Sequence, residues 1–321
     1  MAVLKNTFLY LEILWMILIV ANNLSTILIV LSHKNIRSSV NNFLLSLFTG
    51  NLLYGFSVAF SAVITLYPSM TLNCNYCCAL NFTVIIIPAL GILYSLTAMT
   101  IDRYIAVFYP LRYPQIVKPN VVRAVILVIW LTSIMTGCIP VFWNNITWNK
   151  KLRAACFFIN VVPKFYIWSF IIPPAILTNI IILYVYLRIC CLRHKNLRRI
   201  ATLQNSSQDV HSFVNDSKTT VTVAIIIFSC VFALVPFLVT LILIITKVVV
   251  MNSIWLCSVT YELSFINPMF TPIIFAWRND SFKKSLKAMF HRYKRNKIVS
   301  VRRRSEITEI MALASTFTSH D

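Results

Sequence analysis

Seven long apolar stretches constrain the fold of this chain more than any other feature of its sequence. Apolar residues make up 59% of the 321 residues and charged residues only 12%, which is typical of membrane proteins with several spans rather than of soluble domains. Each stretch is long enough to cross about 30 Å of hydrocarbon as an α-helix. We therefore expect an all-α membrane fold, a seven-transmembrane helix bundle, with spans at about 8–32, 41–66, 76–108, 121–143, 161–188, 217–246 and 251–277.

The positions of the basic residues predict how this bundle is oriented. Of the 29 Lys and Arg residues, 23 lie in four segments: 33–40, 103–123, 188–218 and 278–304. Because positive charge gathers in cytoplasmic loops, we expect residues 1–7 outside the cell and residues 278–321 in the cytoplasm. The first stretch lacks a basic leader and a small-residue cleavage site, so we expect it to stay in the cell membrane as a signal anchor.

The net charge of +20 is compatible with a nucleic-acid partner, but its distribution argues against one. The charge lies beside the spans and in the tail, where it favours contact with anionic membrane lipid. After the last span, apolar residues recur at helical spacing among basic ones, which predicts a short amphipathic cytoplasmic helix: Phe282, Leu286, Phe290 and Tyr293. The serines and threonines that follow are candidate phosphorylation sites.

The third stretch ends in the run MTIDRYIAVFYPLRY, residues 99–113. A charge at the edge of a membrane-spanning helix is costly unless it has a partner, so Asp102 and Arg103 are candidates for a functional role. The alternative is a basic anchor that only sets the topology. The sequence has no HExxH motif, no glycine-rich phosphate loop and no acid pair suited to intramembrane catalysis. We therefore expect neither an enzyme nor a metal or cofactor site.

With DRY closing the third of seven spans, the chain resembles the rhodopsin-like (class A) G-protein-coupled receptors. Further landmarks of that family stand in chain order: Asn23, Asn42–Leu47, Trp130, Pro173 and Pro236. Within the family the chain is most similar to vertebrate odorant receptors, through DRYIAVFYPLRYPQI and through PMFTPIIF followed by AWRNDSFKKSL. Because the second extracellular loop is shorter than theirs, a divergent, fish-type odorant receptor is the leading interpretation. A non-olfactory orphan receptor for a lipid, small molecule or peptide and a non-signalling scaffold or decoy receptor are the alternatives.

The resemblance implies a switch at the cytoplasmic face that contacts a heterotrimeric G protein, with arrestin and a receptor kinase as further partners. Arg103, flanked by Asp102 and Tyr104, is expected to be held at rest by Asp102 and by Asp216 at the start of the sixth span. An N-cap of that span is the alternative role of Asp216. Phe275 replaces the tyrosine of the seventh-span motif.

Other parts of the family's transmission machinery are replaced in this sequence. The second-span acid that binds sodium in the family is Asn51 here, with Ile92 and Thr271 at the neighbouring positions, so we expect no sodium site. The sixth-span tryptophan is Leu234, and alignment assigns the fifth-span tyrosine position to Ile181. The pair of tyrosine hydroxyls that joins spans 5 and 7 in the family is therefore expected to be absent.

The resemblance also implies a pocket for a small hydrophobic ligand between spans 3, 5, 6 and 7. Ile85 stands where amine receptors carry an aspartate, so a cationic amine is disfavoured as the ligand. For any one residue of this set, packing in the core between the helices is the alternative role. The aligned positions are Phe82, Ile85, Ile86, Ala89, Phe165, Tyr166, Ser169, Phe237, Leu238, Leu241, Tyr261, Ser264 and Phe265.

The cysteines fall on both sides of the predicted membrane. The resemblance implies a disulfide between Cys78 and Cys156 on the extracellular side. Cys190 and Cys191 end the fifth span on the reducing side and are candidates for palmitoylation. Asn145 opens a glycosylation sequon in an extracellular loop.

Two acids lie inside the outer halves of the spans, where burial is expensive without a partner. Glu12 and Glu262 fall on the faces where spans 1 and 7 are expected to approach. Either both reach the extracellular interface, or one of them binds a group of the ligand or Lys247.

Overall fold

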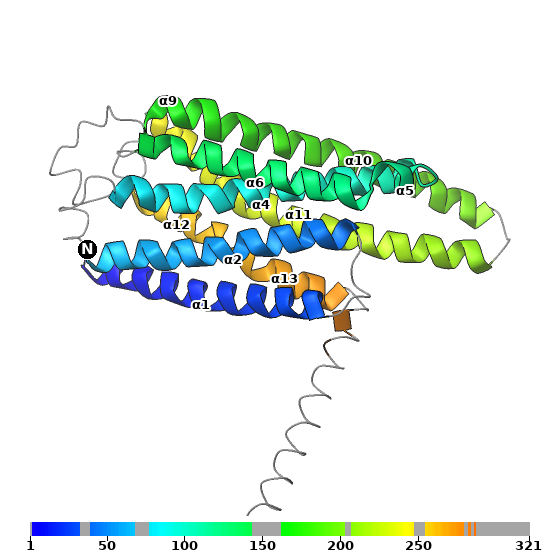
Figure 1. Ribbon diagram of the computed structural model, residues 1–321, viewed down its shortest axis with the longest axis horizontal. Coiled ribbons are helices and arrows are strands. Elements are labelled where there is room, and N and C mark those ends of the chain that lie inside the picture. Colours follow the sequence, from blue (N-terminus) through cyan, green and yellow to red (C-terminus); the bar gives the residue numbers. More distant parts are fainter. Residues whose placement is uncertain are drawn as a thin grey trace, which may run out of the picture. The chain divides into compact units, whose positions relative to one another are not determined.

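The computed structural model describes residues 2–32, 39–67, 77–142, 162–202, 207–246 and 254–278, together with residues 282, 283 and 286. Every regular element in these ranges is helical, and Figure 1 shows the long helices running side by side. The chain up to Arg278 forms one compact unit, and residues 279–321 form a second unit. The bundle described below is the first of these units. The expectation of an all-α fold is confirmed for the described residues.

Six long helices account for most of the first six predicted spans, and the fifth also includes the turns α9 and η2 before α10. Each carries a segment long and apolar enough to cross a membrane. The expected limits follow the apolar part only, because helix formation continues into polar sequence beyond the hydrocarbon edge. The six are α1 (Ala2–Ser32), α2 (Ser39–Leu66), α4 (Cys77–Phe108), α6 (Pro119–Phe142), α10 (Ile172–Thr202) and α11 (Ser207–Ile245). The turn α9 (Lys164–Tyr166) and the π-helical turn η2 (Ile167–Ile171) lead directly into α10, and the short helix α5 (Tyr113–Ile116) follows α4.

The seventh predicted span is interrupted. It consists of α12 (Ile254–Ser264) and α13 (Ile266–Arg278), which meet at Phe265. Pro268 explains the break, because a proline has no amide hydrogen for the carbonyl of Ser264 and its ring crowds that carbonyl. The chain nevertheless stays hydrogen-bonded here, since the amide of Phe265 donates to the carbonyl of Glu262 at 3.1 Å.

The helices pack in an order that makes α4 central. α4 contacts α2, α6, α10 and α11, whereas α1 packs on α2 and α13, and α11 packs on α12 and α13. A close approach between α4 and α6 depends on Gly91, because a Cβ there would lie 3.3 Å from the ring of Trp130. The indole N–H of Trp130 donates to Ser46 Oγ of α2 at 3.1 Å, so this tryptophan joins three helices.

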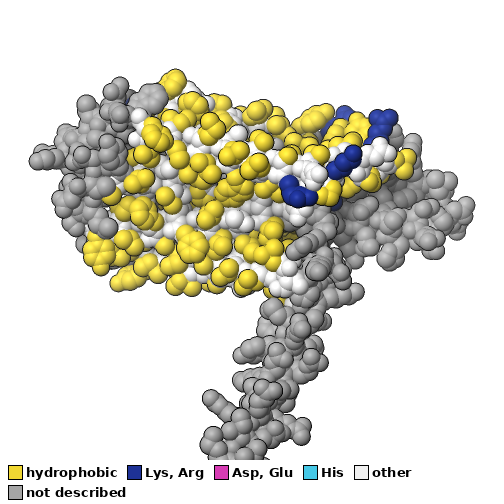
Figure 2. Space-filling view, viewed as in Figure 1, with side chains coloured by type: hydrophobic (Ala, Val, Ile, Leu, Met, Phe, Trp, Pro, Cys, Tyr) yellow, Lys and Arg dark blue, Asp and Glu magenta, His cyan; other side chains and the backbone are white. Residues whose placement is uncertain are grey.

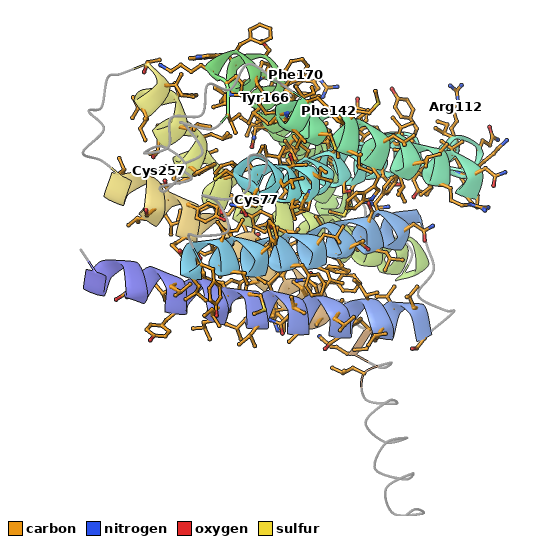
Figure 3. The ribbon with its side chains drawn as sticks, turned by 60° about the vertical axis from the view of Figure 1, so that its left-hand side comes forward. Cys77, Arg112, Phe142, Tyr166, Phe170 and Cys257 are labelled. Atoms are coloured by element: carbon orange, nitrogen blue, oxygen red, sulfur yellow. The ribbon has the colours of Figure 1, made fainter. Side chains whose placement is uncertain are left out.

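The outside of the bundle is apolar along its length. Figure 2 shows hydrophobic side chains over most of the described surface on this face, with Lys and Arg gathered at one end. That is the end at which α5 lies in Figure 1, and it is called the Arg103 end here. Figure 3 places Arg112 at this end and Cys77, Cys257 and Tyr166 toward the opposite end, called the Cys78 end. An apolar belt with charge beyond it suits a bundle surrounded by lipid.

Candidate functional site

The Arg103 end holds a buried charge cluster built from α4 and α5. The Arg103 guanidinium donates to Asp102 Oδ2 from Nη2 at 2.6 Å and from Nε at 3.1 Å. The hydroxyl of Tyr113 donates to Asp102 Oδ1 at 2.9 Å. Both charged residues are buried, and a buried ion pair is stable only while each charge keeps its partners. The predicted pairing of Arg103 with Asp102 is confirmed, and Tyr113 is a member of the cluster that sequence reasoning missed.

Two other residues were predicted to belong to the switch, Tyr104 on α4 and Asp216 on α11, and the structure describes the side chain of the first. Tyr104 stacks on Phe108 with ring centroids 4.4 Å apart, so it packs beside the charge cluster. The side chain of Asp216 lies outside the described residues, and its pairing with Arg103 stays a prediction. The alternative N-cap role is wrong, because α11 begins at Ser207 and Asp216 lies inside the helix.

A tyrosine of α10 lies beside the Arg103 guanidinium. The hydroxyl of Tyr186 is buried, has no hydrogen-bond partner among the described residues and is close enough to feel the Arg103 charge. The sequence-based assignment of the family's fifth-span tyrosine position was Ile181. Tyr186 lies five residues further along α10 and brings its hydroxyl beside Arg103.

Phe275 brings no hydroxyl to this region. Its ring is buried and packs edge-on against Phe48 of α2, with centroids 5.5 Å apart. Phe275 therefore supplies no seventh-span hydroxyl, and the expected absence of the family's hydroxyl pair stays a prediction. Tyr186 of α10 nevertheless brings a hydroxyl close to Arg103.

The middle of the bundle contains hydrogen-bonded amides in place of acids. Asn23 Nδ2 donates to the carbonyl of Pro268 at 2.9 Å, which ties α1 to α13. Asn51 Nδ2 donates to Asn23 Oδ1 at 3.2 Å, whereas Asn51 Oδ1 is buried and has no partner among the described residues. A hard cation prefers several oxygens that include a carboxylate, and this neutral pair supplies amide oxygens but no carboxylate.

A second polar contact joins α11 to α13. Ser229 Oγ donates to Asn267 Oδ1 at 3.2 Å, and Thr271 Oγ1 donates to the same oxygen at 3.1 Å. Leu234, which replaces the family's tryptophan, is half-buried on α11. Spans 6 and 7 are thus held together by a serine and an amide rather than by an indole.

Near the Cys78 end, several predicted ligand-pocket residues meet in one buried apolar cluster. Phe82 and Ile86 of α4, Tyr166 of α9 and Leu241 of α11 belong to it, and Ile85 packs against it. The Tyr166 hydroxyl donates to the carbonyl of Thr136 at 2.9 Å, so its polar atom is already used. This cluster therefore presents hydrocarbon and aromatic side chains from spans 3, 5 and 6, and Asn81 and Thr83 of α4 are buried polar residues beside Phe82 in the sequence.

Two predicted pocket residues of the fifth span do not join this cluster. Phe165 is 59% exposed, and Ser169 is also exposed on the outside of the bundle. Phe170 is half-buried instead and stacks on Tyr166 with centroids 5.7 Å apart, as Figure 3 shows. Ser169 lies within the π-helical turn η2 and Phe165 lies before it, so spacing counted back from Pro173 as in a regular helix misplaces their faces.

The predicted pocket residues of spans 6 and 7 lie in an aromatic group. Tyr261 packs on Phe265 at 4.9 Å and on Phe237 at 6.0 Å between ring centroids. Ser264 Oγ lies 3.2 Å from the hydroxyl of Tyr54 on α2, which sequence reasoning did not include. Phe265 also approaches α1 and α2, so this group extends away from the apolar cluster of α4. The two remaining pocket residues, Ala89 and Leu238, are half-buried.

Glu12 and Glu262 lie together beside the aromatic group. Each is half-buried and has an Oε2 atom without a hydrogen-bond partner among the described residues. The two carboxyls are close enough to repel each other, and the Trp15 indole interacts with the Glu262 carboxyl. This agrees with the expectation that Glu12 and Glu262 lie on the faces where spans 1 and 7 approach, while their binding of a ligand group stays a prediction. Lys247, the alternative partner, lies outside the described residues.

The cysteines at the Cys78 end are partly described. Cys77 and Cys78 are both disulfide-bonded. Cys156, the expected partner of Cys78, lies outside the described residues, and so does Asn145 with its sequon. Cys257 is a free thiol on α12.

Known proteins similar to this chain agree with these features. A family model described as the seven-transmembrane receptor (rhodopsin family) matches residues 22–275. The chain is 26% identical to the rat adenosine receptor A2b over 308 residues, covering 88% of this chain and 89% of that receptor. It is 27% identical to the chicken A2b receptor over 318 residues, covering 88% of each. With the dog adenosine receptor A2a it shares 26% over 273 residues, covering 79% of this chain and 65% of that receptor.

These relatives leave one expectation unsupported, and the family match confirms another. They are adenosine receptors, so they give no support to the finer resemblance to odorant receptors. The family match spans most of the chain and includes the Arg103 cluster, the central amides and the aromatic group. It also excludes an enzyme, as the sequence predicted. The chain therefore belongs to the rhodopsin family of seven-transmembrane receptors.

Proposed function

We propose that this chain is a signalling receptor of the cell membrane that converts the binding of a small ligand near the Cys78 end into activation of a heterotrimeric G protein at the Arg103 end. The observation that carries this proposal is the buried Asp102–Arg103–Tyr113 cluster, which spans the junction of α4 and α5. Burial of the Arg103 guanidinium costs desolvation. A scaffold or decoy receptor would have no use for a buried charge at this end of the bundle.

The cluster supports a two-state mechanism. At rest, Asp102 holds the guanidinium, and Tyr113 holds Asp102. When α11 moves away from α4 as a rigid body, Arg103 becomes available to the G protein. Tyr186 has an unused hydroxyl beside the guanidinium and is suited to accept a hydrogen bond from Arg103 in that second state. Pairing of Arg103 with Asp216 would add to the resting restraint, and Asp216→Ala is then expected to raise basal signalling.

The orientation of the receptor in the membrane is inferred from the distribution of its basic residues. The basic segments, which lie at the Arg103 end where they are described, favour the cytoplasmic side for this end and for the tail. The N-terminus and the disulfide-bonded cysteines would then face outward, where disulfides persist. Arrestin and a receptor kinase are proposed as further partners of the Arg103 end and the serine- and threonine-containing tail.

The ligand is proposed to be small and largely apolar. The cluster of Phe82, Ile86, Tyr166 and Leu241 offers hydrocarbon and aromatic surface. Buried polar groups lie on α4 at Asn81 and Thr83 and, in larger number, on spans 1, 2 and 7 around Tyr54, Ser264 and Glu262. The names of the relatives make adenosine the second candidate. A nucleoside would need to form its hydrogen bonds mainly with the polar groups around Tyr54, Ser264 and Glu262. An apolar odorant remains the proposal from the sequence resemblance.

A ligand screen tests these proposals directly. The full chain is expressed with a promiscuous G protein and exposed to adenosine, apolar odorants and simple lipids, and intracellular calcium is measured. Surface labelling of an epitope tag confirms equal expression, and Arg103→Ala serves as the signalling-dead control. A response that disappears in the control supports a signalling receptor and identifies the ligand class. A ligand that binds without any response in either protein would favour a decoy receptor.

A further inference from the structure

Two adjacent thiols lie at the Arg103 end of α10. Cys190 and Cys191 are both free and both exposed. The other free cysteines of the described chain differ: Cys230 is buried, and Cys138 and Cys257 are half-buried. The sequence has no cysteine after Cys257, so Cys190 and Cys191 are the pair available at this end of the bundle.

These thiols continue the surface of α10 that faces away from the bundle. Exposed apolar residues recur along α10 with the spacing of one helix face: Leu177, Ile180, Tyr184 and Leu187. Cys191 takes the next position on this face. Ile182, Val185 and Ile189 are buried on the opposite side. From Leu177 to Cys191 this apolar stripe rises about 21 Å at the α-helical rise per residue. A hydrocarbon chain attached to the thiol would have a matching apolar track to lie along.

The depth of the thiols in the membrane is fixed by their neighbours. The apolar span ends at Leu192, and Arg193, Lys195, Arg198 and Arg199 follow in the sequence. Arg188 is 5.7 Å from the ring centroid of Phe108, the last residue of α4, so the two helices reach the interface at the same level. The thiols therefore lie where hydrocarbon meets the basic segment, which is attracted to anionic lipid. A cysteine at this level is within reach of both a membrane-bound acyl donor and the acyl chains of the bilayer.

We propose that Cys190 and Cys191 form an S-acylation site that takes a long-chain fatty acyl group. The proposal rests on the orientation proposed above, with the Arg103 end in the cytoplasm. The co-substrate is a long-chain acyl-coenzyme A thioester. The Sγ atom attacks the acyl carbonyl carbon and forms a new thioester, the bond from that carbon to the coenzyme A sulfur breaks, and coenzyme A leaves as a thiol with the proton given up by the cysteine. The oxidation state of every atom is unchanged.

Acylation would fix the Arg103 end of α10 at the membrane surface. Tyr186 lies one helical turn before Cys190, and its hydroxyl is beside Arg103. The acyl chains would thus anchor the part of the fifth span that contacts the switch, without occupying the switch itself.

A mass-tag exchange experiment tests the site on the full chain in cultured cells. Disulfides are reduced, all free thiols are blocked with a maleimide, thioesters are cleaved with hydroxylamine, and each released thiol is coupled to a polyethylene glycol maleimide. We expect up to two hydroxylamine-dependent tags on the wild-type chain, up to one on Cys190→Ser or Cys191→Ser and none on the double variant. Cys230→Ser, which removes the buried thiol, is the matched control and should keep the wild-type pattern.

The outcomes separate this proposal from that of the receptor function. The tagging needs neither ligand nor G protein, so a failed ligand screen leaves its result valid. Absence of hydroxylamine-dependent tags on surface-expressed protein overturns the proposal, and so does persistence of the tags in the double variant. Labelling of Cys191 on intact cells by a membrane-impermeant maleimide, lost in Cys191→Ser, would place this end outside and overturn it as well.

Discussion

The hydroxyl of Tyr113 donates a hydrogen bond of 2.9 Å to Asp102, the same carboxylate that holds Arg103. This contact ties the short helix α5 to the end of α4. It also satisfies the second oxygen of Asp102, which would otherwise be a buried acceptor without a partner. The position of α5 and the protection of the Arg103 ion pair therefore depend on one side chain.

Tyr113→Phe is expected to raise ligand-independent signalling several-fold. The substitution removes one hydrogen bond to a charged group, a contact that contributes about 1.5–3 kcal/mol, and weakens the resting arrangement of Arg103. Basal second-messenger level at matched surface expression is the measurement. Tyr109→Phe, at an exposed position on the same connection, should leave the basal level unchanged. Equal basal signalling in both variants would mean that Tyr113 only positions the loop.

Tyr186→Phe tests the active state, in which Arg103 is proposed to bond to the Tyr186 hydroxyl. Its hydroxyl has no partner at rest among the described residues, so its removal should not lower the melting temperature of the ligand-free protein. A hydrogen bond from Arg103 in the active state would be lost, and agonist potency should fall about tenfold, which corresponds to about 1.4 kcal/mol. Tyr184→Phe is the control, because that side chain is exposed on the outside of α10. Loss of stability without loss of potency would assign Tyr186 to packing alone.

Much of the fold could be predicted from the sequence because the bilayer limits the choices. Apolar length alone located six spans, since every backbone polar group in the hydrocarbon must be satisfied within a helix. The break at Phe265 was not predicted. Pro268 made a break plausible, but whether a helix bends or is interrupted depends on which neighbours satisfy the freed carbonyl.

The site was predicted in part, and the misses have two physical origins. On α4, which is continuous from Cys77 to Phe108, spacing from Arg103 gives the face of each residue, and Phe82 and Ile86 do lie in one buried cluster. On the fifth span the π-helical turn η2 lies between Phe165 and Pro173 and shifts the register of the residues before it. Spacing from Pro173 consequently selected the exposed Phe165. Tyr186 lies after η2, in the regular helix α10, and its proximity to Arg103 has no periodic signal in the sequence. Hydrogen bonds between distant segments, such as that of Tyr113, leave no periodic signal in the sequence.

Replacement of sodium by choline at constant ionic strength is expected to leave agonist affinity unchanged. Asn51 and Asn23 supply amide groups that bond to each other, and neither offers the carboxylate that a hard cation prefers. Competition binding with a radioligand identified in the screen measures the affinity. A change of more than about threefold between the two salts, equivalent to about 0.65 kcal/mol, would show that a sodium site exists despite the lost acid.

Neutralisation of one member of the Glu12–Glu262 pair is expected to stabilise the receptor. The two carboxyls are half-buried and close enough to repel each other, and each has an oxygen without a partner among the described residues. Glu12→Gln removes that repulsion and keeps the side-chain shape, so the melting temperature in detergent should rise. Glu262→Gln should do the same alone but add little in the Glu12→Gln background, because contacting residues couple by about 0.5–3 kcal/mol.

A double-mutant cycle of thermal shifts makes this test quantitative, with Glu306→Gln in the tail as the matched control that should change nothing. Additive effects of Glu12→Gln and Glu262→Gln would mean that the two acids act independently, each reaching its own polar surroundings. A ligand potency that changes with Glu262→Gln but not with Glu12→Gln would point to a direct contact of Glu262 with the ligand, because relief of repulsion alone should affect both variants alike.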